Sequence, residues 1–416
     1  MSDSLKLGTI PSDQFSDYRY NVIFDAYKWD PQVEDHDTIA RQVVLITPQL
    51  ADQLELWAEE LSAETVLMEE ALLHNPPLSK KLGIPRKIQR ALRTSGNYES
   101  GQHPRLLRFD FHPTTDGWAV SEVNSDVPGG LAEASILPQI AASHFPGFSP
   151  GRHIGQSLLE AFRSRIEPGG VIALVHATSY SDDRQVMQFL GDYFAANGYF
   201  PLYAAPDHLR WNGNQATSIV EGSEGPVDGI LRFFPLEWLV TLPRNTGWQG
   251  YFSAATPSCN HPVAMLSQSK RLPLVWDRLG IDIPTWKMLL PETVAPGKIG
   301  RSDGWIFKPA LGRVGENITI RDAVSQKELK KLERSASFHP KNWIAQHMFH
   351  SAPLTTDEGE TFHLCLGVFT VDGKRAGFYG RISPFSRIDS RAKDIPVLVT
   401  DTPGTLNDNL GKESPR

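Results

Sequence analysis

The sequence predicts a mixed α+β and α/β fold, and three observations carry this prediction. Residues 47–74 repeat apolar side chains at helical spacing, residues 171–203 alternate strand, helix and strand, and residues 108–130 have the pattern of a β-hairpin. Together these patterns favour a mixed fold over an all-α or all-β one. A chain of 416 residues is too long for one simple core, so we expect two or three domains.

The composition is that of an ordinary globular protein, with 40% hydrophobic and 21% charged residues and a net charge of -7. Such a balance predicts neither a nucleic-acid partner nor an anionic membrane surface. No stretch approaches the ~18 to 20 apolar residues of a membrane span, and the N-terminus lacks a signal-peptide core. The two cysteines, Cys259 and Cys365, predict no disulfide framework, and we expect Cys365 in the core of a cytoplasmic protein.

The first ~100 residues are predicted to be mainly helical. Thr47-Pro48 fits a helix start, because proline is favoured in the first turn. The apolar residues that follow at helical spacing are Leu50, Leu54, Trp57, Leu61, Val66, Leu67 and Leu72. A second helix is predicted over Pro85–Thr94, whereas residues 1–40 show no clear periodicity.

Residues 108–130 are predicted to fold back at the turn dipeptide Asp116-Gly117. Because side chains alternate across a strand, Glu122 and Asn124 share one face of the returning strand. The hairpin then brings that face alongside Asp110. Three oxygen donors with an arginine nearby suit Mg²⁺ that carries nucleotide phosphates, although the spacing alone also fits a solvated strand face.

A small βαβ layer is predicted after two helices, over Leu131–Ala142 and Gln156–Ile166. Val171–Val175 is a continuous apolar run, which is typical of a buried parallel strand. The layer continues with an amphipathic helix over Asp182–Asn197 and strands over Phe200–Tyr203 and Val227–Phe234.

The second half of the chain is predicted to hold a helix over Pro262–Leu279 and several strands. The strands are Trp305–Lys308, Asn317–Ile320, Trp343–Met348, His363–Val371 and Arg375–Ile382, with a hairpin turn at Asp372-Gly373. Ser325–Arg334 is predicted to be a helix whose basic face is solvated. The end of the chain from Asp401 is expected to be frayed.

The stretch from Phe307 to Ile318 places a lysine at a strand end, directly before a glycine-containing loop. Glycines allow backbone N–H groups to approach phosphate oxygens, so Lys308 and Arg313 are candidates for phosphate contacts around Gly312 and Gly315. It is not a Walker P-loop, because no Gly-Lys-Ser/Thr follows. Taken alone, the loop also fits a plain turn.

Two histidines near these segments have alternative roles. His112 is either a metal ligand or a packing residue, and packing is favoured because Mg²⁺ prefers oxygen donors. His176 ends a predicted strand, with Asp182 and Asp183 beyond it. Because loops at strand ends often bind ligands, His176 is either a substrate contact or an ordinary structural residue.

Five segments of the chain share a pattern with one family of enzymes. They are Arg108–Asn124, Arg232–Trp238, Lys270–Pro291, Phe307–Ile318 and Gln346–Arg381. In this order, from about residue 45 to about residue 400, the chain resembles the glutathionylspermidine synthase-like branch of the ATP-grasp carboxylate–amine ligases. The predicted metal hairpin precedes the phosphate-loop lobe, which is the order of the circularly permuted ATP-grasp branch.

The resemblance implies an ATP-grasp-like fold with circular permutation, a helical N-terminal region, a small βαβ layer and a lid lobe. Residues 1–165 would hold the helical region and the metal-binding hairpin, and residues 166–260 the βαβ layer. Residues 261–400 would form the nucleotide-binding and lid lobe, and residues 401–416 a flexible tail.

The resemblance also implies roles for single residues. It assigns Mg²⁺ to Asp110, Glu122 and Asn124; ATP to Lys270, Lys308, Gly312, Arg313, Gly315 and Gln346; and charge neutralisation during phosphoryl transfer to Arg108 and Arg381. The implied reaction joins a small-molecule or peptide carboxylate to an amine through an acyl phosphate. Positioning and charge stabilisation carry most of such catalysis.

The chain departs from the family pattern at Ser125–Gly129, where Val127 and Gly129 replace hydroxyl-bearing residues, and at Ile382–Phe385, which replaces an acidic run. These departures argue against glutathione and a polyamine as the substrates, and no amidase domain is expected before the hairpin. Two other functions stay open: a catalytically weak Mg-ATP-binding regulatory protein, and a phosphotransferase. The complete set of predicted metal ligands favours the ligase.

Overall fold

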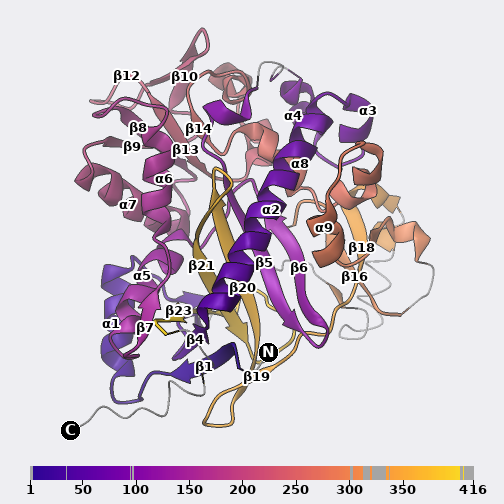
Figure 1. The fold of residues 1–416 in the computed structure, drawn as a ribbon. Coiled ribbons are helices and arrows are strands. Elements are labelled where there is room, and N and C mark those ends of the chain that lie inside the picture. Colours follow the sequence, from indigo (N-terminus) through magenta and orange to yellow (C-terminus); the bar gives the residue numbers. More distant parts are fainter. Residues whose placement is uncertain are drawn as a thin grey trace.

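A six-stranded sheet at the centre of the computed structural model joins strands from both halves of the chain (Figure 1). Its order is β22-β21-β20-β5-β6, with β19 paired to β20. Its strands are β5 (Leu106–Thr114), β6 (Gly117–Asn124), β19 (Leu354–Thr355), β20 (Thr361–Val371), β21 (Lys374–Ser383) and β22 (Lys393–Ile395). The structure describes residues 3–33, 35–93, 95, 98–299, 303–312, 319–320, 334–336, 338–402 and 406.

Two hairpins build this sheet, and both were predicted. β5 and β6 are antiparallel, with a shift in register between Phe109 and Phe111 that is typical of a β-bulge. β20 and β21 are joined at Asp372-Gly373, whose φ angles of 50° and 75° suit a tight hairpin turn. β20 also pairs with β5, so the two hairpins form one surface.

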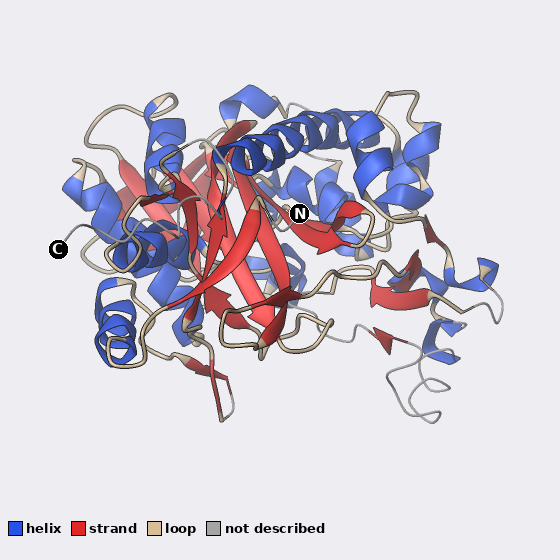
Figure 2. Ribbon diagram, turned by 60° about the horizontal axis from the view of Figure 1, so that its bottom comes forward, coloured by secondary structure: helices blue, strands red, loops and turns tan. Residues whose placement is uncertain are grey.

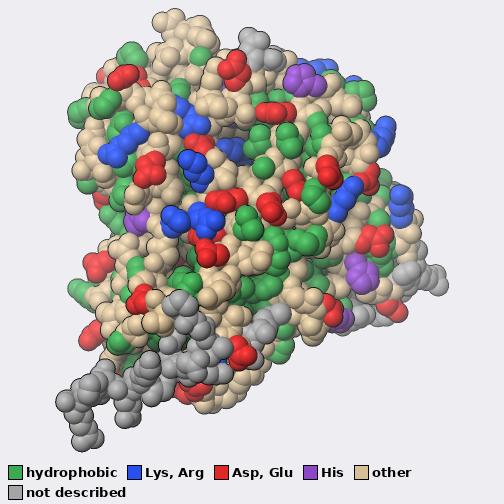
Figure 3. All heavy atoms as spheres, viewed as in Figure 1, with side chains coloured by type: hydrophobic (Ala, Val, Ile, Leu, Met, Phe, Trp, Pro, Cys, Tyr) green, Lys and Arg blue, Asp and Glu red, His purple; other side chains and the backbone are tan. Residues whose placement is uncertain are grey.

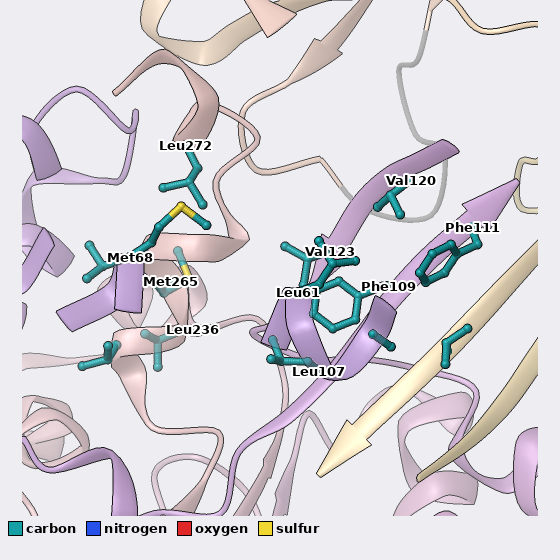
Figure 4. Close-up of a cluster of buried hydrophobic side chains, with 14 of the residues drawn as sticks. Leu61, Met68, Leu107, Phe109, Phe111, Val120, Val123, Leu236, Met265 and Leu272 are labelled. Atoms are coloured by element: carbon teal, nitrogen blue, oxygen red, sulfur yellow. The ribbon is translucent and has the colours of Figure 1, made fainter. Parts of the chain in front are cut away.

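The helix α2 (Pro48–Leu73) crosses the central sheet, as Figures 1 and 2 show. It begins where the sequence predicts, because the Thr47 side chain accepts a hydrogen bond from the backbone N–H of Leu50. Figure 4 shows Leu61 and Met68 among apolar side chains of β5, β6 and the segment around Met265. The long helix and the hairpin therefore share one core.

The N-terminal region is less helical than predicted, because it also contributes two strands to a second sheet. This sheet has the order β1-β4-β23-β7, with β1 (Leu5–Thr9), β4 (Gln42–Ile46), β7 (Phe148–Pro150) and β23 (Val397–Thr400). All five residues of β4 are buried, and a fully buried strand shows no alternation that would distinguish it in the sequence. The helices of this region are α1 (Phe15–Asp25), α3 (Pro76–Ser79) and α4 (Arg86–Leu92), and α4 matches the second predicted helix.

The βαβ layer is present as predicted, and its four strands are all parallel. The order is β14-β13-β8-β9, with β8 (Val171–His176), β9 (Phe200–Ala204), β13 (Gly229–Phe233) and β14 (Ser258–Cys259). The helix α7 (Ser181–Ala196) packs on β8 and β9, and the helices α5 (Leu131–Ala142) and α6 (Ile154–Arg163) share an apolar cluster with the layer. The smaller strands nearby are β2 (Gln32–Val33), β3 (His36–Asp37), β10 (Leu209–Asn212), β11 (Gln215–Ser218) and β12 (Gly225–Pro226).

The helix predicted over Pro262–Leu279 is wrong, because the chain breaks there into short pieces. They are 3₁₀ turns at Pro262–Ala264, Leu272–Leu274 and Trp276–Arg278 and the helix α8 (Met265–Gln268). Ser269 leaves helical geometry with φ -70° and ψ 118°, and Pro273 removes a backbone donor further on. The break allows the Lys270 backbone N–H to donate to the Ala310 carbonyl at 2.9 Å.

A small sheet of order β15-β18-β16-β17 lies to one side of the central sheet (Figures 1 and 2). Its strands are β15 (Thr293–Val294), β16 (Trp305–Pro309), β17 (Thr319–Ile320) and β18 (Trp343–His347), and α9 (Pro284–Leu289) precedes it. β16 and β18 confirm two predicted strands. Arg313, Gly315 and most of the helix predicted over Ser325–Arg334 lie outside the described residues.

Basic and acidic side chains are interspersed over the face drawn in Figure 3. In the part of the chain that the structure describes, no helix is both long enough and apolar enough to cross a membrane. Cys259 and Cys365 are both buried free thiols, and the burial of Cys365 confirms its predicted place in the core. The division into four sequence ranges stays a prediction, although the central sheet joins residues of its first and third ranges.

Candidate active site

A cavity of about 660 Å³ lies where the central sheet, the βαβ layer and the small sheet meet. It is lined by six of the residues that the sequence singled out: Arg108, Asp110, Glu122, Asn124, Lys308 and Arg381. A smaller cavity of about 30 Å³ beside it is lined by Lys270 and Gln346. Ser121, Glu122 and Gln268 line both cavities, so Glu122 stands between them.

The hairpin brings Arg108, Asp110 and Asn124 together. Arg108 Nε donates to Asp110 Oδ1 at 2.7 Å and Arg108 Nη2 donates to Asp110 Oδ2 at 3.0 Å. Asn124 lies opposite Arg108 in the register, and its Nδ2 donates to Asp110 Oδ2 at 3.0 Å. Both oxygens of the buried Asp110 carboxylate therefore accept hydrogen bonds from its neighbours.

Two glycines leave room for the Arg108 side chain. A Cβ atom on Gly367, which lies opposite Asp110 on β20, would stand 2.7 Å from Arg108 Cδ. A Cβ on Gly130 would stand 2.8 Å from the Tyr379 ring, and that ring lies 5.0 Å from the Arg108 guanidinium carbon. Arg108 Nη1 donates to the Gly129 carbonyl at 2.7 Å, so the guanidinium is held on several sides.

Lys270, which follows α8, and Lys308, which lies on β16, approach the hairpin from outside the central sheet. Lys270 Nζ lies 2.7 Å from Glu122 Oε2 and donates to the Gly312 carbonyl at 2.7 Å. Lys308 Nζ, on β16, donates to the Ser121 carbonyl at 3.1 Å. The small sheet is therefore tied to the hairpin by the two lysines that were predicted to contact phosphates.

Burial and charge set opposite protonation tendencies in this group. Burial by itself raises the pKa of Glu122, but Lys270 and Lys308 outweigh it and bring the pKa to about 2. Burial lowers the pKa of Lys308 to about 8, and Glu122 offsets this only in part. Burial also disfavours the charged form of Arg108, but Asp110 outweighs it and raises the pKa of Arg108. The cluster holds its charges by pairing them.

Gln346 and Arg381 occupy opposite sides of the site. Gln346 lies opposite Thr293 on β15, and its Nε2 donates to Thr293 Oγ1 at 3.0 Å. Its buried Oε1 has no hydrogen-bond partner, which leaves an acceptor at the smaller cavity. Arg381 lies on β21 and donates to the Asp389 carbonyl. Burial lowers and Tyr379 raises the pKa of Arg381, and the net effect is a raised pKa.

Both histidines are engaged by neighbouring residues, and His112 also lines the large cavity. His112 contacts Ser121 Oγ at 3.0 Å and lies against Phe349, and burial lowers the pKa of His112 to about 4. A neutral imidazole engaged in this way agrees with the packing role that was favoured. His176 is buried, and its Nδ1 lies 3.3 Å from the Leu174 carbonyl.

The donor set fits a hard cation by its chemistry. Asp110 and Glu122 supply carboxylate oxygens and Asn124 an amide oxygen, which are the donors that Mg²⁺ prefers. Within the described ranges, no group of three or more His, Cys, Asp or Glu side chains stands in a metal-binding arrangement. A metal here would therefore rest on two carboxylates and an amide, with its remaining positions filled by phosphate or water.

Part of the site could not be found from the sequence. Lys28 Nζ lies 2.8 Å from Glu133 Oε1 and 2.8 Å from Asp394 Oδ2, and the Tyr379 hydroxyl donates to Asp394 Oδ1 at 2.6 Å. All four residues line the large cavity. They come from four separate elements or loops, and Lys28 lies in a segment without periodicity, so no sequence signal connects them.

The chain departs from the family pattern directly after Asn124, and the first two residues of that segment have a structural role. Ser125 and Asp126 are both fully buried, and their backbone N–H groups donate to Gln268 Oε1 at 2.9 and 2.8 Å. Val127, Gly129 and Gly130 line the large cavity instead. Only this later part of the segment can meet a substrate.

One cavity in this mixed α/β fold is lined by two paired carboxylates together with buried lysines and arginines. This combination fits an enzyme of the synthetase class, that is, a ligase. The chain belongs to the family described as glutathionylspermidine synthase preATP-grasp, whose model matches residues 16–399. No curated protein matches the sequence.

Solved structures that match the chain include the following two. One is a glutathione synthetase-like effector from Globodera pallida in its apo form, with 11% identity and a TM-score of 0.62, covering 94% of this chain and 99% of the effector. The other is a putative gamma-glutamylcysteine synthetase from Methylobacillus flagellatus KT, with 12% identity and a TM-score of 0.43, covering 78% and 88% of the two chains. The first likeness, which spans nearly the whole of both chains, supports the fold.

Proposed function

We propose that this protein is an ATP-dependent carboxylate–amine ligase that acts through an acyl phosphate. The observation that carries the proposal is the convergence of the hairpin carboxylates with Lys270, Lys308 and Arg108 at one cavity. Buried cations beside carboxylates suit a magnesium-bound triphosphate, which presents negative oxygens to the cations and a metal to the carboxylates. Membership of the family supports the same reaction class.

In this proposal Asp110, Glu122 and Asn124 hold Mg²⁺, which neutralises charge on the β- and γ-phosphates. Lys270 and Lys308 bind phosphate oxygens beside Gly312, and the phosphate contacts predicted for Arg313 and Gly315 lie outside the described residues. Gln346 offers its buried amide to the nucleotide from the smaller cavity. We also infer that the small sheet forms the nucleotide-binding and lid lobe of a circularly permuted ATP-grasp enzyme.

Arg108 and Arg381 serve the reacting groups. The substrate carboxylate oxygen attacks the γ-phosphorus of ATP, the bond to the β,γ-bridging oxygen breaks, and ADP leaves. The amine nitrogen then attacks the acyl carbon, releases inorganic phosphate and loses a proton. The two guanidinium groups keep their charge throughout, so they stabilise the negative oxygens without exchanging protons.

Two other functions predict different products. A regulatory protein would bind Mg-ATP without releasing ADP, and a phosphotransferase would release ADP while leaving a stable phosphorylated product. An ADP-release assay against pooled carboxylates and amines, with mass spectrometry of the products, separates the three. The ligase requires both a carboxylate and an amine for ADP release, and release that needs only one of them would contradict it.

The residue assignment is tested by Asp110→Ala and Glu122→Ala, each of which we expect to abolish ATP turnover with the fold kept. Asp116→Ala is the matched control, because Asp116 is an exposed carboxylate at the turn of the same hairpin. Turnover in the control with none in the two variants supports the metal role. Normal Mg-ATP turnover in Asp110→Ala or Glu122→Ala would remove that carboxylate from the site.

A further inference from the structure

The two carboxylates proposed to bind magnesium each form an ion pair with a basic side chain. Arg108 engages both oxygens of Asp110 at 2.7 and 3.0 Å, and Lys270 Nζ lies 2.7 Å from Glu122 Oε2. These side chains are 8% to 14% exposed, so water compensates little for a lost partner. A metal ion that binds these oxygens must therefore compete for them with a guanidinium or an ammonium group.

Replacing the partners of these ion pairs costs much free energy when Mg²⁺ or the nucleotide binds alone. Three cations, Arg108, Lys270 and Lys308, stand against the two carboxylates, so Mg²⁺ alone adds charge to a group that is already positive. A nucleotide alone would draw the cations to its phosphates and leave buried carboxylates unpaired beside them. Leaving one member of a buried ion pair uncompensated is strongly unfavourable.

The two ligands together satisfy every group. Phosphate oxygens take the place of the carboxylates at Arg108 and Lys270, while Mg²⁺ takes the place of the two cations at Asp110 and Glu122. We propose that Mg²⁺ and the nucleotide bind with strong positive cooperativity, because the Lys270–Glu122 and Arg108–Asp110 ion pairs close the site against either ligand alone. This inference rests on the proposed function, since it concerns the same nucleotide site.

Cooperativity of this kind is reciprocal, and binding measurements show it without turnover. Calorimetric titrations with ATP in EDTA and in MgCl₂, together with Mn²⁺ binding followed by electron paramagnetic resonance with and without ATP, give the coupling factor. The metal–ATP complex formed in solution is included in the fit. We expect each ligand to raise the affinity of the other about ten- to a hundredfold in the wild-type protein.

Lys270→Met tests whether the Lys270–Glu122 ion pair itself, and not the positive charge of the cluster in general, weakens metal binding. It frees Glu122, so we expect Mn²⁺ alone to bind about tenfold more tightly and ATP alone to bind more weakly. Lys308→Met removes a second buried cation of the same group, which donates to a backbone carbonyl and not to a carboxylate. There we expect a smaller gain in Mn²⁺ affinity than in Lys270→Met, and none in Lys287→Met, an exposed lysine that lines neither cavity.

Glu122→Gln gives a second readout in the opposite direction, because it frees Lys270 from its carboxylate. ATP in EDTA should then bind more tightly than to the wild-type protein, while the effect of Mg²⁺ is lost. Equal Mn²⁺ affinities in Lys270→Met and Lys308→Met, or independent binding of metal and ATP to the wild-type protein, would overturn the inference alone. Failure of the wild-type protein to bind Mg-ATP at all would overturn the proposed function with it.

Discussion

Lys308 shows how burial makes a single side chain sensitive to pH. Its ammonium group lies at the wall of the large cavity and donates to a backbone carbonyl, and burial lowers the pKa of Lys308 to about 8. In the unfolded chain a lysine keeps its ordinary pKa near 10.5. Between these two values the unfolded chain binds more protons, so Lys308 lets stability rise with pH from about 8 to about 10.5.

Nucleotide binding should have the opposite pH dependence. The proposed phosphate contact favours the charged ammonium, so ATP binds best below pH 8, and its affinity falls by up to about tenfold per pH unit above that value. Calorimetric titrations with Mg-ATP between pH 7 and pH 9.5 measure this. In Lys308→Arg the guanidinium stays charged, so the fall should disappear, and an identical pH profile in the variant would remove Lys308 from the nucleotide site.

At the scale of elements, one buried ion pair joins the hairpin to the βαβ layer. Arg232 on β13 and Asp126 after β6 are both buried, with Arg232 Nη2 at 2.5 Å from Asp126 Oδ1. The backbone N–H of Leu236 donates to Asp126 Oδ2 at 3.1 Å. The segment from Arg232 to Trp238, which also carries part of the family pattern, thus fixes the position of the chain that leaves the β5–β6 hairpin.

Breaking this pair should destabilise the protein strongly. Arg232→Met removes the guanidinium that pairs with the buried Asp126 carboxylate, and we expect the free energy of unfolding to fall by about 3–5 kcal/mol in urea titrations. Adding Asp126→Asn should restore part of the loss, because it removes the buried negative charge. Lys287→Met breaks an exposed ion pair and should cost less than about 1 kcal/mol. A comparable loss in that control would contradict the role of burial.

At the scale of the whole molecule, the two ends of the described chain close one sheet. β23 pairs in parallel with β4 and antiparallel with β7, and Leu398 in its middle is 0% exposed. The central sheet likewise combines strands from both halves of the chain. The site depends on the joining of distant strands, because β20 and β21 lie beside the β5–β6 hairpin in the central sheet and β21 brings Arg381 to the cavity.

Leu398→Ala tests how much stability the closing strand contributes. We expect a loss of about 2–5 kcal/mol in the free energy of unfolding, because the buried side chain leaves a cavity. Leu67→Ala is the matched control, since Leu67 is 48% exposed on α2 and should change stability by less than about 0.5 kcal/mol. Urea unfolding followed by circular dichroism measures both, and equal losses would show that β23 is not part of the cooperative unit.

The sequence by itself determined the elements that depend on neighbouring residues, together with the part of the site that lies on a single hairpin. Turn dipeptides, a helix cap and apolar runs predicted α2, the two hairpins and the βαβ layer, because each depends on residues close together in the chain. For the same reason Asp110 and Asn124, on neighbouring strands of one hairpin, were placed together correctly. The strand-end pattern before the glycine loop singled out Lys308, and the resemblance to the family added Lys270. No local pattern predicts the contacts of either lysine with the hairpin.

Only the tertiary structure decided which distant segments meet. β4 and β23 are short buried strands whose pairing depends on partners from the other end of the chain, and a period of two cannot reveal them. The break at Ser269, which turns a predicted helix into short pieces, follows from contacts of Ser269 and Lys270 with Leu82 and Ala310. The Lys270–Glu122 ion pair arises in the same way, since the two residues are neighbours in space alone.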